Sequence, residues 1–383
     1  MEEIPMNPTP TTRQNVLGLA LVVLSCLSAC GGDDNNNGGG GGTPPVPPTP
    51  VVAYVANQTS NNVSAFTING TSGALVPVAG SPFPVGTTPG GIAVSTDGTL
   101  AYVANQGSNT VSAFSVNMAT GVPTAVSGSP FGAGTTPFKV TMSPNRSFVY
   151  VTNQGSNDVS AFSIDATGKL TPVSGSPFAV GFTPAGIALS PNGAFLYVAN
   201  QASNNVSAFT VTAATGQLAS VAGSPFAVGT TPFGVVVSPN GSFVYVTNQG
   251  SNFVSAFSIT QVTGVLTPVT GSPFVTGFTP AGITITPNGA FLYVANQASN
   301  NVSAFAAAAN GVLTPLGAPI PAGTTPSAAT VSPDGAFLYV ANQGSNDVSA
   351  FAIDGTSGSL TSVTGSPFAA GVTPRAIATP GRP

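Results

Sequence analysis

One pentapeptide recurs seven times along the chain at a nearly constant spacing. The motif Tyr-Val-(Ala/Thr)-Asn-Gln begins at Tyr54, Tyr102, Tyr150, Tyr197, Tyr245, Tyr293 and Tyr339. Successive copies lie 48, 48, 47, 48, 48 and 46 residues apart, and Val-Ser-Ala-Phe starts nine residues after each tyrosine. A repeat of this length is one supersecondary unit that cannot bury its apolar face alone. The seven units must therefore pack against one another.

Each unit is predicted to contain four short strands. In one unit these are residues 185–190 (AGIALS), 195–199 (FLYVA), 206–211 (VSAFTV) and 217–222 (QLASVA). Residues 191–193 (Pro-Asn-Gly) form a strong hairpin signal between the first two strands. No helical period is present after the amino-terminal segment. Four antiparallel strands per unit predict an all-β chain folded as a seven-bladed β-propeller.

The phase of the repeat predicts how the ring closes. The repetitive region begins at Val51 with a second strand, whereas residues 373–378 (TPRAIA) align with the first strands of the other units. We therefore expect the carboxy-terminal strand to complete the blade that the amino-terminal strand begins.

The amino terminus has the features of an export signal. Residues 16–27 are apolar and follow Arg13, a run too short to span a bilayer but typical of a signal peptide. Leu27-Ser28-Ala29-Cys30 resembles the lipobox of bacterial lipoproteins, which implies cleavage before Cys30 and lipidation of its thiol. The alternatives are an ordinary secretory signal with an incidental cysteine, a second lipobox ending at Cys26, and a start at Met6.

These features divide the chain into three parts. Residues 1–29 are predicted to be a lipoprotein signal peptide, residues 30–50 a Gly/Asn/Pro-rich tether, and residues 51–383 the propeller. Gly31 resembles the residue found after the lipidated cysteine in lipoproteins sent to the outer membrane. We therefore expect a lipid-anchored protein of the bacterial cell envelope, attached at Cys30 and located at the outer membrane.

Composition excludes several function classes for residues 51–383. Charged residues make up 4% of the chain, so there is no basic surface for nucleic acid. The chain has no His, its only glutamates are Glu2 and Glu3, and its only cysteines are Cys26 and Cys30. Imidazole and thiolate ligands are therefore absent from the expected propeller, and we predict no metal and no cofactor.

The repeat also carries a family resemblance. Tyr-Val-Thr-Asn, together with Ser-Pro-Asn/Asp-Gly at residues 190–193 and 332–335, resembles the YVTN-repeat propellers of the 6-phosphogluconolactonase-like (lactonase) family. The resemblance covers residues 51–380. It implies lactone chemistry run by His, Arg and Glu side chains on one face, but the His and Glu positions have no match here. We therefore predict no catalytic residue.

Departures from the repeat give the candidate binding residues. Lys139 stands where most units have Gly, and Arg375 stands where others have Gly, Phe, Ala or Ser. Both open first strands, which line the channel of a propeller, so they would place positive charge there and favour an anionic ligand. The alternatives are sequence drift at Lys139 and an effect of the nearby terminus at Arg375.

The seven Asn-Gln pairs that end the second strands are the other candidates. They include Asn153-Gln154 and Asn342-Gln343. Two interpretations remain: the amides bridge backbone groups within tight loops, or they form a ring of donors and acceptors around the channel. Asp158 and Asp347 are oxygen donors suited to calcium, but an equivalent position holds Phe253, which favours an exposed loop position.

The sequence therefore favours a non-catalytic propeller, held at the membrane through Cys30, that acts as a binding or interaction module. A glycan, a peptide or another protein would be its partner. Two alternatives stay open: a lactonase-like hydrolase of the 6-phosphogluconolactonase type, and a structural surface protein. The shortage of acid-base groups argues against the hydrolase, because such catalysis near neutral pH favours His or a tuned Glu.

Overall fold

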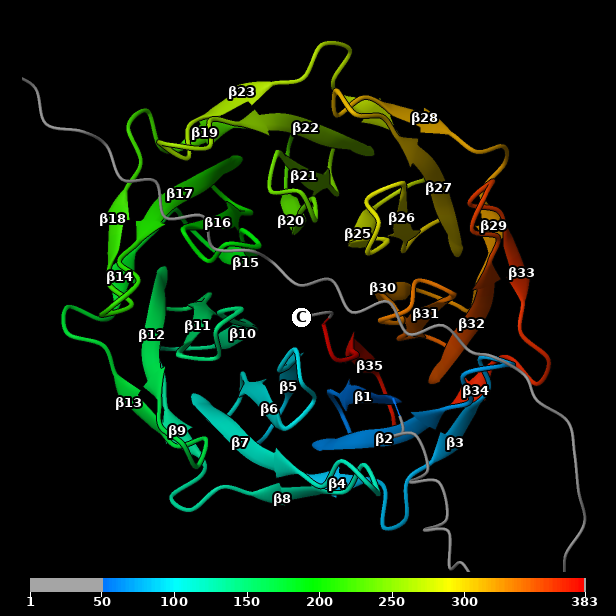
Figure 1. Ribbon diagram of the computed structural model, residues 1–383, viewed down its shortest axis with the longest axis horizontal. Coiled ribbons are helices and arrows are strands. Elements are labelled where there is room, and N and C mark those ends of the chain that lie inside the picture. The colour runs from blue at the N-terminus through cyan, green and yellow to red at the C-terminus, as the bar shows by residue number, and fades with distance from the viewer. Residues whose placement is uncertain (1–50, 382–383) are drawn as a thin grey trace, which may run out of the picture. The chain divides into compact units, whose positions relative to one another are not determined.

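The computed structural model describes residues 51–381. Their regular structure consists of 35 strands in seven sheets, set around a central axis (Figure 1). Strands pair antiparallel within every sheet, which confirms the seven-bladed β-propeller. Residues 51–381 include no helix of the length and hydrophobicity that a bilayer crossing requires.

The strands fall into groups by their place in the blade, from the axis outward. The first strands are β5 (Pro89–Val94), β10 (Pro137–Met142), β15 (Pro184–Leu189), β20 (Pro232–Val237), β25 (Pro280–Ile285), β30 (Pro326–Val331) and β35 (Pro374–Ala378). The second strands are β1 (Val51–Asn57), β6 (Leu100–Asn105), β11 (Phe148–Asn153), β16 (Phe195–Asn200), β21 (Phe243–Asn248), β26 (Phe291–Asn296) and β31 (Phe337–Asn342). The third strands are β2 (Asn62–Ile68), β7 (Thr110–Val116), β12 (Asp158–Ile164), β17 (Asn205–Val211), β22 (Phe253–Ile259), β27 (Asn301–Ala307) and β32 (Asp347–Ile353).

The outermost layer of each blade consists of two short strands. The first pieces are β3 (Leu75–Pro77), β8 (Pro123–Ala125), β13 (Leu170–Pro172), β18 (Leu218–Ser220), β23 (Leu266–Pro268), β28 (Leu313–Pro315) and β33 (Leu360–Ser362). The second pieces are β4 (Phe83–Pro84), β9 (Phe131–Gly132), β14 (Phe178–Ala179), β19 (Phe226–Ala227), β24 (Phe274–Val275), β29 (Ile320–Pro321) and β34 (Phe368–Ala369).

The broken outer layer differs from the single fourth strand that was predicted for residues 217–222. Both β18 and β19 pair with β17, and the chain turns between them at Gly223, whose φ is +81°. There Ser224 Oγ accepts a hydrogen bond of 2.9 Å from the backbone N–H of Ala208. The Ser224 hydroxyl thus accepts the hydrogen bond from Ala208 that a carbonyl of a continuous outer strand would have accepted.

The ring closes as the sequence predicts. β35 pairs antiparallel with β1, with Tyr54 opposite Ala378 and Asn57 opposite Pro374. Figure 1 shows the red carboxy-terminal strand between the blue amino-terminal strand and the axis. The last strand is therefore the innermost strand of the first blade.

Two sets of equivalent hydrogen bonds join neighbouring blades. Each motif tyrosine donates its hydroxyl to a glycine carbonyl of the next blade, at 2.7 to 3.2 Å, and the bond from Tyr339 to Gly73 links the last blade to the first. In the loops, seven asparagine Oδ1 atoms accept the backbone N–H of a threonine at 2.7 to 2.8 Å. The seven tyrosines are at most 1% exposed, so they belong to the core between blades.

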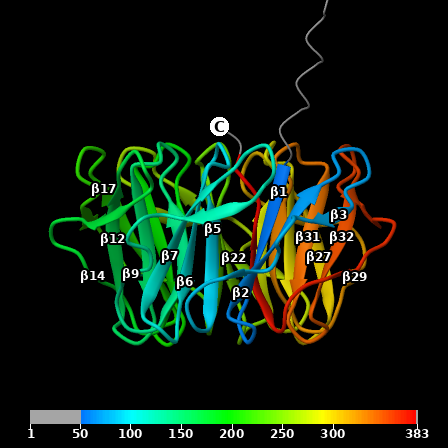
Figure 2. The same cartoon turned by 90° about the horizontal axis from the view of Figure 1, so that it is seen from below.

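The propeller has two faces, seen edge-on in Figure 2. First strands begin beside the ends of second strands, as Pro89 pairs with Asn105. We call this side, which carries the Asn-Gln pairs, the amide face. The opposite side carries the hairpins between first and second strands, such as residues 191–193, and we call it the turn face.

Candidate functional site

The first strands place two rings of residues around the channel near the amide face. The outer ring, one residue after each strand's proline, is Gly90, Phe138, Ala185, Phe233, Ala281, Ser327 and Arg375. The inner ring follows it: Gly91, Lys139, Gly186, Gly234, Gly282, Ala328 and Ala376. Glycine dominates the inner ring because neighbouring strands approach closely there. A Cβ added to Gly186 would lie 2.3 Å from the carbonyl oxygen of Phe233.

Three residues of the outer ring form an aromatic–arginine cluster: Phe138, Phe233 and Arg375. The two phenylalanine rings meet edge to face, with their centroids 5.6 Å apart. The Arg375 guanidinium lies 5.2 Å from the Phe138 centroid and 5.5 Å from the Phe233 centroid. A cation within about 6 Å of an aromatic face is attracted to the ring quadrupole. The cluster therefore holds a positive charge at the mouth of the channel.

Arg375 keeps hydrogen-bonding capacity in this position. One terminal nitrogen donates to Gln343 Oε1 at 3.1 Å, whereas the buried Nε–H has no hydrogen-bond partner among residues 51–381. Burial lowers the pKa of Arg375, but a guanidinium stays protonated in proteins. The mouth thus holds a permanent cation, whose buried Nε–H is left without a hydrogen-bond partner among the described residues.

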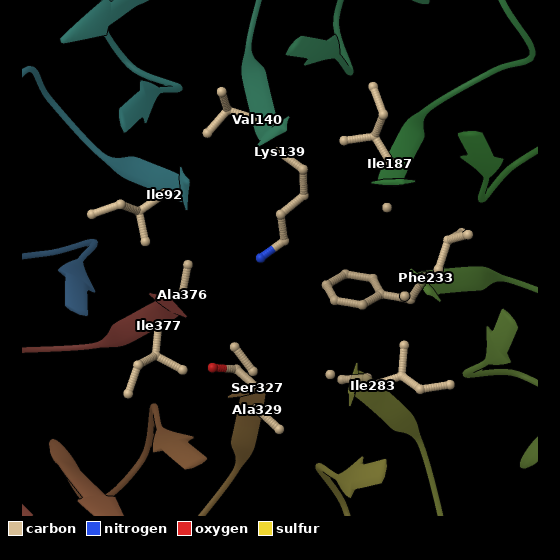
Figure 3. A pocket seen from close by; sticks show the side chains of 16 residues that line it. Ile92, Lys139, Val140, Ile187, Phe233, Ile283, Ser327, Ala329, Ala376 and Ile377 are labelled. Atoms are coloured by element: carbon tan, nitrogen blue, oxygen red, sulfur yellow. The ribbon is translucent and has the colours of Figure 1, made fainter. Parts of the chain in front are cut away.

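Lys139 extends into the cavity beside this cluster. The cavity has a volume of about 140 Å³, and Figure 3 shows the Lys139 side chain reaching toward its middle while the Phe233 ring enters from another blade. The ammonium lies 5.3 Å from the Phe138 centroid and donates to the Gly90 carbonyl at 3.4 Å. Burial, and secondarily the charge of Arg375, lower the pKa of Lys139 to about 7.

The rest of the cavity wall is uncharged. Its side chains are aliphatic, aromatic or absent, apart from the Ser327 hydroxyl, which donates to the Pro374 carbonyl at 3.0 Å. Lys139 is the only ionisable residue among those that line it. Arg375 is permanently charged and Lys139 is about half charged at pH 7, with no carboxylate among the residues that line the cavity. These charges give the channel the electrostatics of an anion site.

The Asn-Gln pairs divide into two roles. Asn153 and Asn342 are fully buried, and each donates to an aspartate and a serine of its own blade. The glutamines are half-buried and bridge blades: Gln154 donates to Gln201 at 3.4 Å, and Gln343 accepts from Gln297 at 3.5 Å. The structure thus brings Lys139, Arg375 and Gln343 to one region, keeps Gln154 in the amide ring, and places both asparagines inside their blades.

The aspartates considered for calcium have partners within the protein. Asp158 Oδ1 accepts from Asn153 Nδ2 at 2.6 Å, and Asp347 Oδ1 accepts from Asn342 Nδ2 at 2.7 Å. Residues 51–381 contain no group of three His, Cys, Asp or Glu side chains that could hold a metal ion. The predicted lipidation site at Cys30 lies outside the described residues.

Sequence reasoning missed the two phenylalanines of the cluster. From the sequence, Phe138 and Phe233 are only two of the residues found at the repeat position of Arg375, and no binding role is predicted for them. The available signal was their size, because other units place Gly, Ala or Ser there. Large side chains in a narrow ring reach one another across the channel mouth, and these two meet each other and Arg375.

Comparison with known proteins places this architecture among its relatives. The family model of the lactonase, seven-bladed β-propeller type matches residues 52–181, 176–279 and 270–373. No curated protein matches the chain in sequence.

Solved structures resemble the fold at low sequence identity. A periplasmic gluconolactonase from Pseudomonas aeruginosa is 20% identical, with a TM-score of 0.74, covering 87% of this chain and 99% of that one. A proposed 6-phosphogluconolactonase from Bacteroides fragilis is 21% identical, with a TM-score of 0.77, covering 88% and 99%. At this identity the likeness shows the fold, and the family model shows the membership. The chain belongs to the lactonase family of seven-bladed β-propellers.

Proposed function

We propose that this propeller binds a small organic acid, of the sugar-lactone or sugar-acid class, at the amide-face mouth of its channel. The observation that carries the proposal is the pair of cations, Lys139 and Arg375, within 5.3 Å of the same Phe138 ring in an otherwise uncharged channel. Such a site favours a phosphate or carboxylate, because unpaired buried charge is costly and an anion would relieve it.

The family supports the sugar part of the ligand. Its solved neighbours include proteins described as a gluconolactonase and as a proposed 6-phosphogluconolactonase. Hydroxyl groups of a sugar acid would find amide partners in the half-buried glutamines, since Gln343 already stands beside Arg375. The acid group of the ligand would contact the Arg375 guanidinium, and the sugar hydroxyls would contact the glutamines of the amide face.

Calorimetric titration of the full-length chain tests this proposal. We expect 6-phosphogluconate and gluconate to bind and neutral glucose not to bind. Arg375→Ala should weaken binding about 10- to 100-fold, because a hydrogen bond to a charged group contributes about 1.5–3 kcal/mol. Arg146→Ala, on the turn face, is the matched control and should leave affinity unchanged. Equal affinity for glucose, or an unaffected Arg375→Ala, would overturn the proposal.

Hydrolysis of the bound lactone is the second candidate function. Lys139 favours it, because a pKa of about 7 suits a general base at neutral pH. Only the neutral amine accepts a proton, so turnover should rise with pH through about 7 and level off above that value. A lactonase rate that Lys139→Met leaves unchanged would exclude this role.

Anchoring at the cell envelope forms the other part of the proposal. Val51 begins β1 at the turn face, whereas Asn57 ends it at the amide face. A chain lipidated at Cys30 would therefore enter the propeller at Val51, on the face opposite the amide-face mouth. Radiolabelled palmitate should enter the wild-type protein in a bacterial host and not Cys30→Ser. Lack of label in the wild type would contradict the anchor.

A further inference from the structure

Lys139 has surroundings that ordinary lysines lack. It is half-buried, so solvent reaches it through the channel, yet its amine faces a cavity with no other ionisable side chain. None of the cavity-lining residues is a carboxylate. Its single hydrogen bond, to the Gly90 carbonyl at 3.4 Å, is long. Nothing in the cavity wall therefore fixes the amine as an ion-paired ammonium.

Two effects favour the uncharged amine: burial penalises the ammonium, and the charge of Arg375 repels it. The Gly90 carbonyl, at 3.4 Å, opposes them only weakly because the hydrogen bond is long. The pKa of about 7 that results leaves roughly half of the lysine neutral at pH 7. A lysine with the reference pKa of about 10.4 is neutral in less than about one molecule in a thousand. A desolvated lysine of this kind is an activated nucleophile toward carbonyl carbon.

We propose that Lys139 forms an imine with a small carbonyl compound that carries an acid group, such as a 2-oxo acid. The amine adds to the carbonyl carbon to give a carbinolamine, which loses its hydroxyl as water when the C=N bond forms. Oxygen leaves as water with the two protons of the amine, and no oxidant or reductant is consumed. The acid group would lie on Arg375, and this part of the inference rests on the proposed anion site.

The cavity limits the size of this partner. Its volume of about 140 Å³ suits a compound of a few carbon atoms, and the ring of Gly186, Gly234 and Gly282 leaves the backbone exposed to it. Apolar side chains such as Ile92, Ile187 and Ile283 line the rest and limit the access of water that would hydrolyse the imine.

The chain supplies its own control for the test. Among residues 51–381 the only other lysine is Lys169, which is exposed in a loop between β12 and β13. The full-length protein at pH 7 is incubated with glyoxylate and sodium cyanoborohydride, which reduces the imine to a stable secondary amine. Peptide mass spectrometry then measures adducts on both lysines. We expect Lys139 to react at least about tenfold faster than Lys169, an advantage that follows from its larger neutral fraction.

Two comparisons separate this inference from the anion site. Acetaldehyde, which carries no acid group, should also prefer Lys139 over Lys169, but by a smaller ratio than glyoxylate. Equal ratios for the two aldehydes would overturn the part that rests on Arg375 and leave the imine standing. Labelling of Lys139 no faster than Lys169 by either aldehyde would overturn the imine, even where calorimetry still shows sugar-acid binding.

Folding controls complete the experiment. Lys139→Met should lose the fast adduct and keep the slow one on Lys169, with its melting curve recorded beside the wild type. In denaturing urea the two lysines of the wild type should react alike, because the cavity no longer exists. A preference for Lys139 that persists in urea would assign the reactivity to local sequence and contradict the inference.

Discussion

The space between blades and the channel wall follow opposite rules in this propeller. Between blades, the same tyrosine-to-glycine bond recurs seven times, and every motif tyrosine is buried. Along the channel, the equivalent positions carry Gly, Phe, Ala, Ser or Arg. The repeat is maintained where each unit packs against its neighbour, and it is lost along the single channel that all seven units share.

Removal of β35, the strand that closes the ring, should lower the stability of the propeller more than any of the point substitutions that follow. Deletion of residues 373–383 removes β35 from the first blade. The edge of β1 and the hydrophobic cluster that contains Ile377 then become exposed to solvent. We expect the melting temperature to fall by more than about 10 °C, since about 1 kcal/mol corresponds to about 2–4 °C in domains of about 150–250 residues. Circular dichroism measures it, and deletion of residues 381–383 is the control. Equal melting of the two truncated proteins would disprove the closure.

Loss of one inter-blade hydroxyl should have a moderate effect. Tyr150→Phe removes the 2.9 Å bond to the Gly216 carbonyl and leaves that acceptor buried. We expect a loss of about 1–3 kcal/mol in the free energy of unfolding, measured by urea denaturation. Lys139→Met in the channel should cost nothing or stabilise the fold, because it removes a buried cation. The comparison fails if the channel variant is the more damaging one.

Stability should depend on pH through Lys139. Its pKa of about 7 in the folded protein lies below the unfolded value of 10.5, so the unfolded chain binds more protons between these values. Stability therefore rises with pH across this window, by at most about 1.4 kcal/mol per pH unit. Urea denaturation at pH 7, 8 and 9 should show this rise in the wild type and a smaller one in Lys139→Met. Parallel pH profiles would show that Lys139 is not the cause.

The smallest effect is expected at Arg146 on the turn face. Arg146 adopts φ 56°, where the equivalent turns have glycine, for example Gly193 and Gly241. Arg146→Gly relieves the backbone strain of a non-glycine residue at positive φ, but it also removes the exposed ion pair with Asp97. The two changes oppose each other, so the free energy of unfolding should shift by less than about 0.5 kcal/mol. A larger decrease in the free energy of unfolding, measured by urea denaturation, would show that the ion pair stabilises the fold.

The sequence predicts the repetitive region almost completely and the channel only in part. The spacing of the tyrosines predicts the blade number, and the phase of residues 373–378 predicts the closure by β35. The break in the outer strand escapes prediction, because it depends on Ser224 Oγ reaching the Ala208 amide across the blade. Lys139 and Arg375 stand out as departures from the repeat, but their meeting with Phe138 depends on side chains that reach across the channel mouth.

The asparagine and glutamine of each pair show the same limit. The sequence does not distinguish Asn342 from Gln343, but Asn342 is the last residue of β31 and Gln343 is the first residue of the turn that follows. Asn342 is buried and donates hydrogen bonds to Asp347 and Ser349 of the same blade. Gln343 instead accepts a hydrogen bond from Arg375. Only the position of the axis relative to the strand decides which amide a ligand can reach.

A crystal structure of the full-length protein with 6-phosphogluconate tests the central claim most directly. We expect the ligand at the amide-face mouth, with its acid group on the Arg375 guanidinium and near Lys139, and a hydroxyl on Gln343. A ligand bound on the turn face, or an unoccupied channel mouth at saturating concentration, would contradict it.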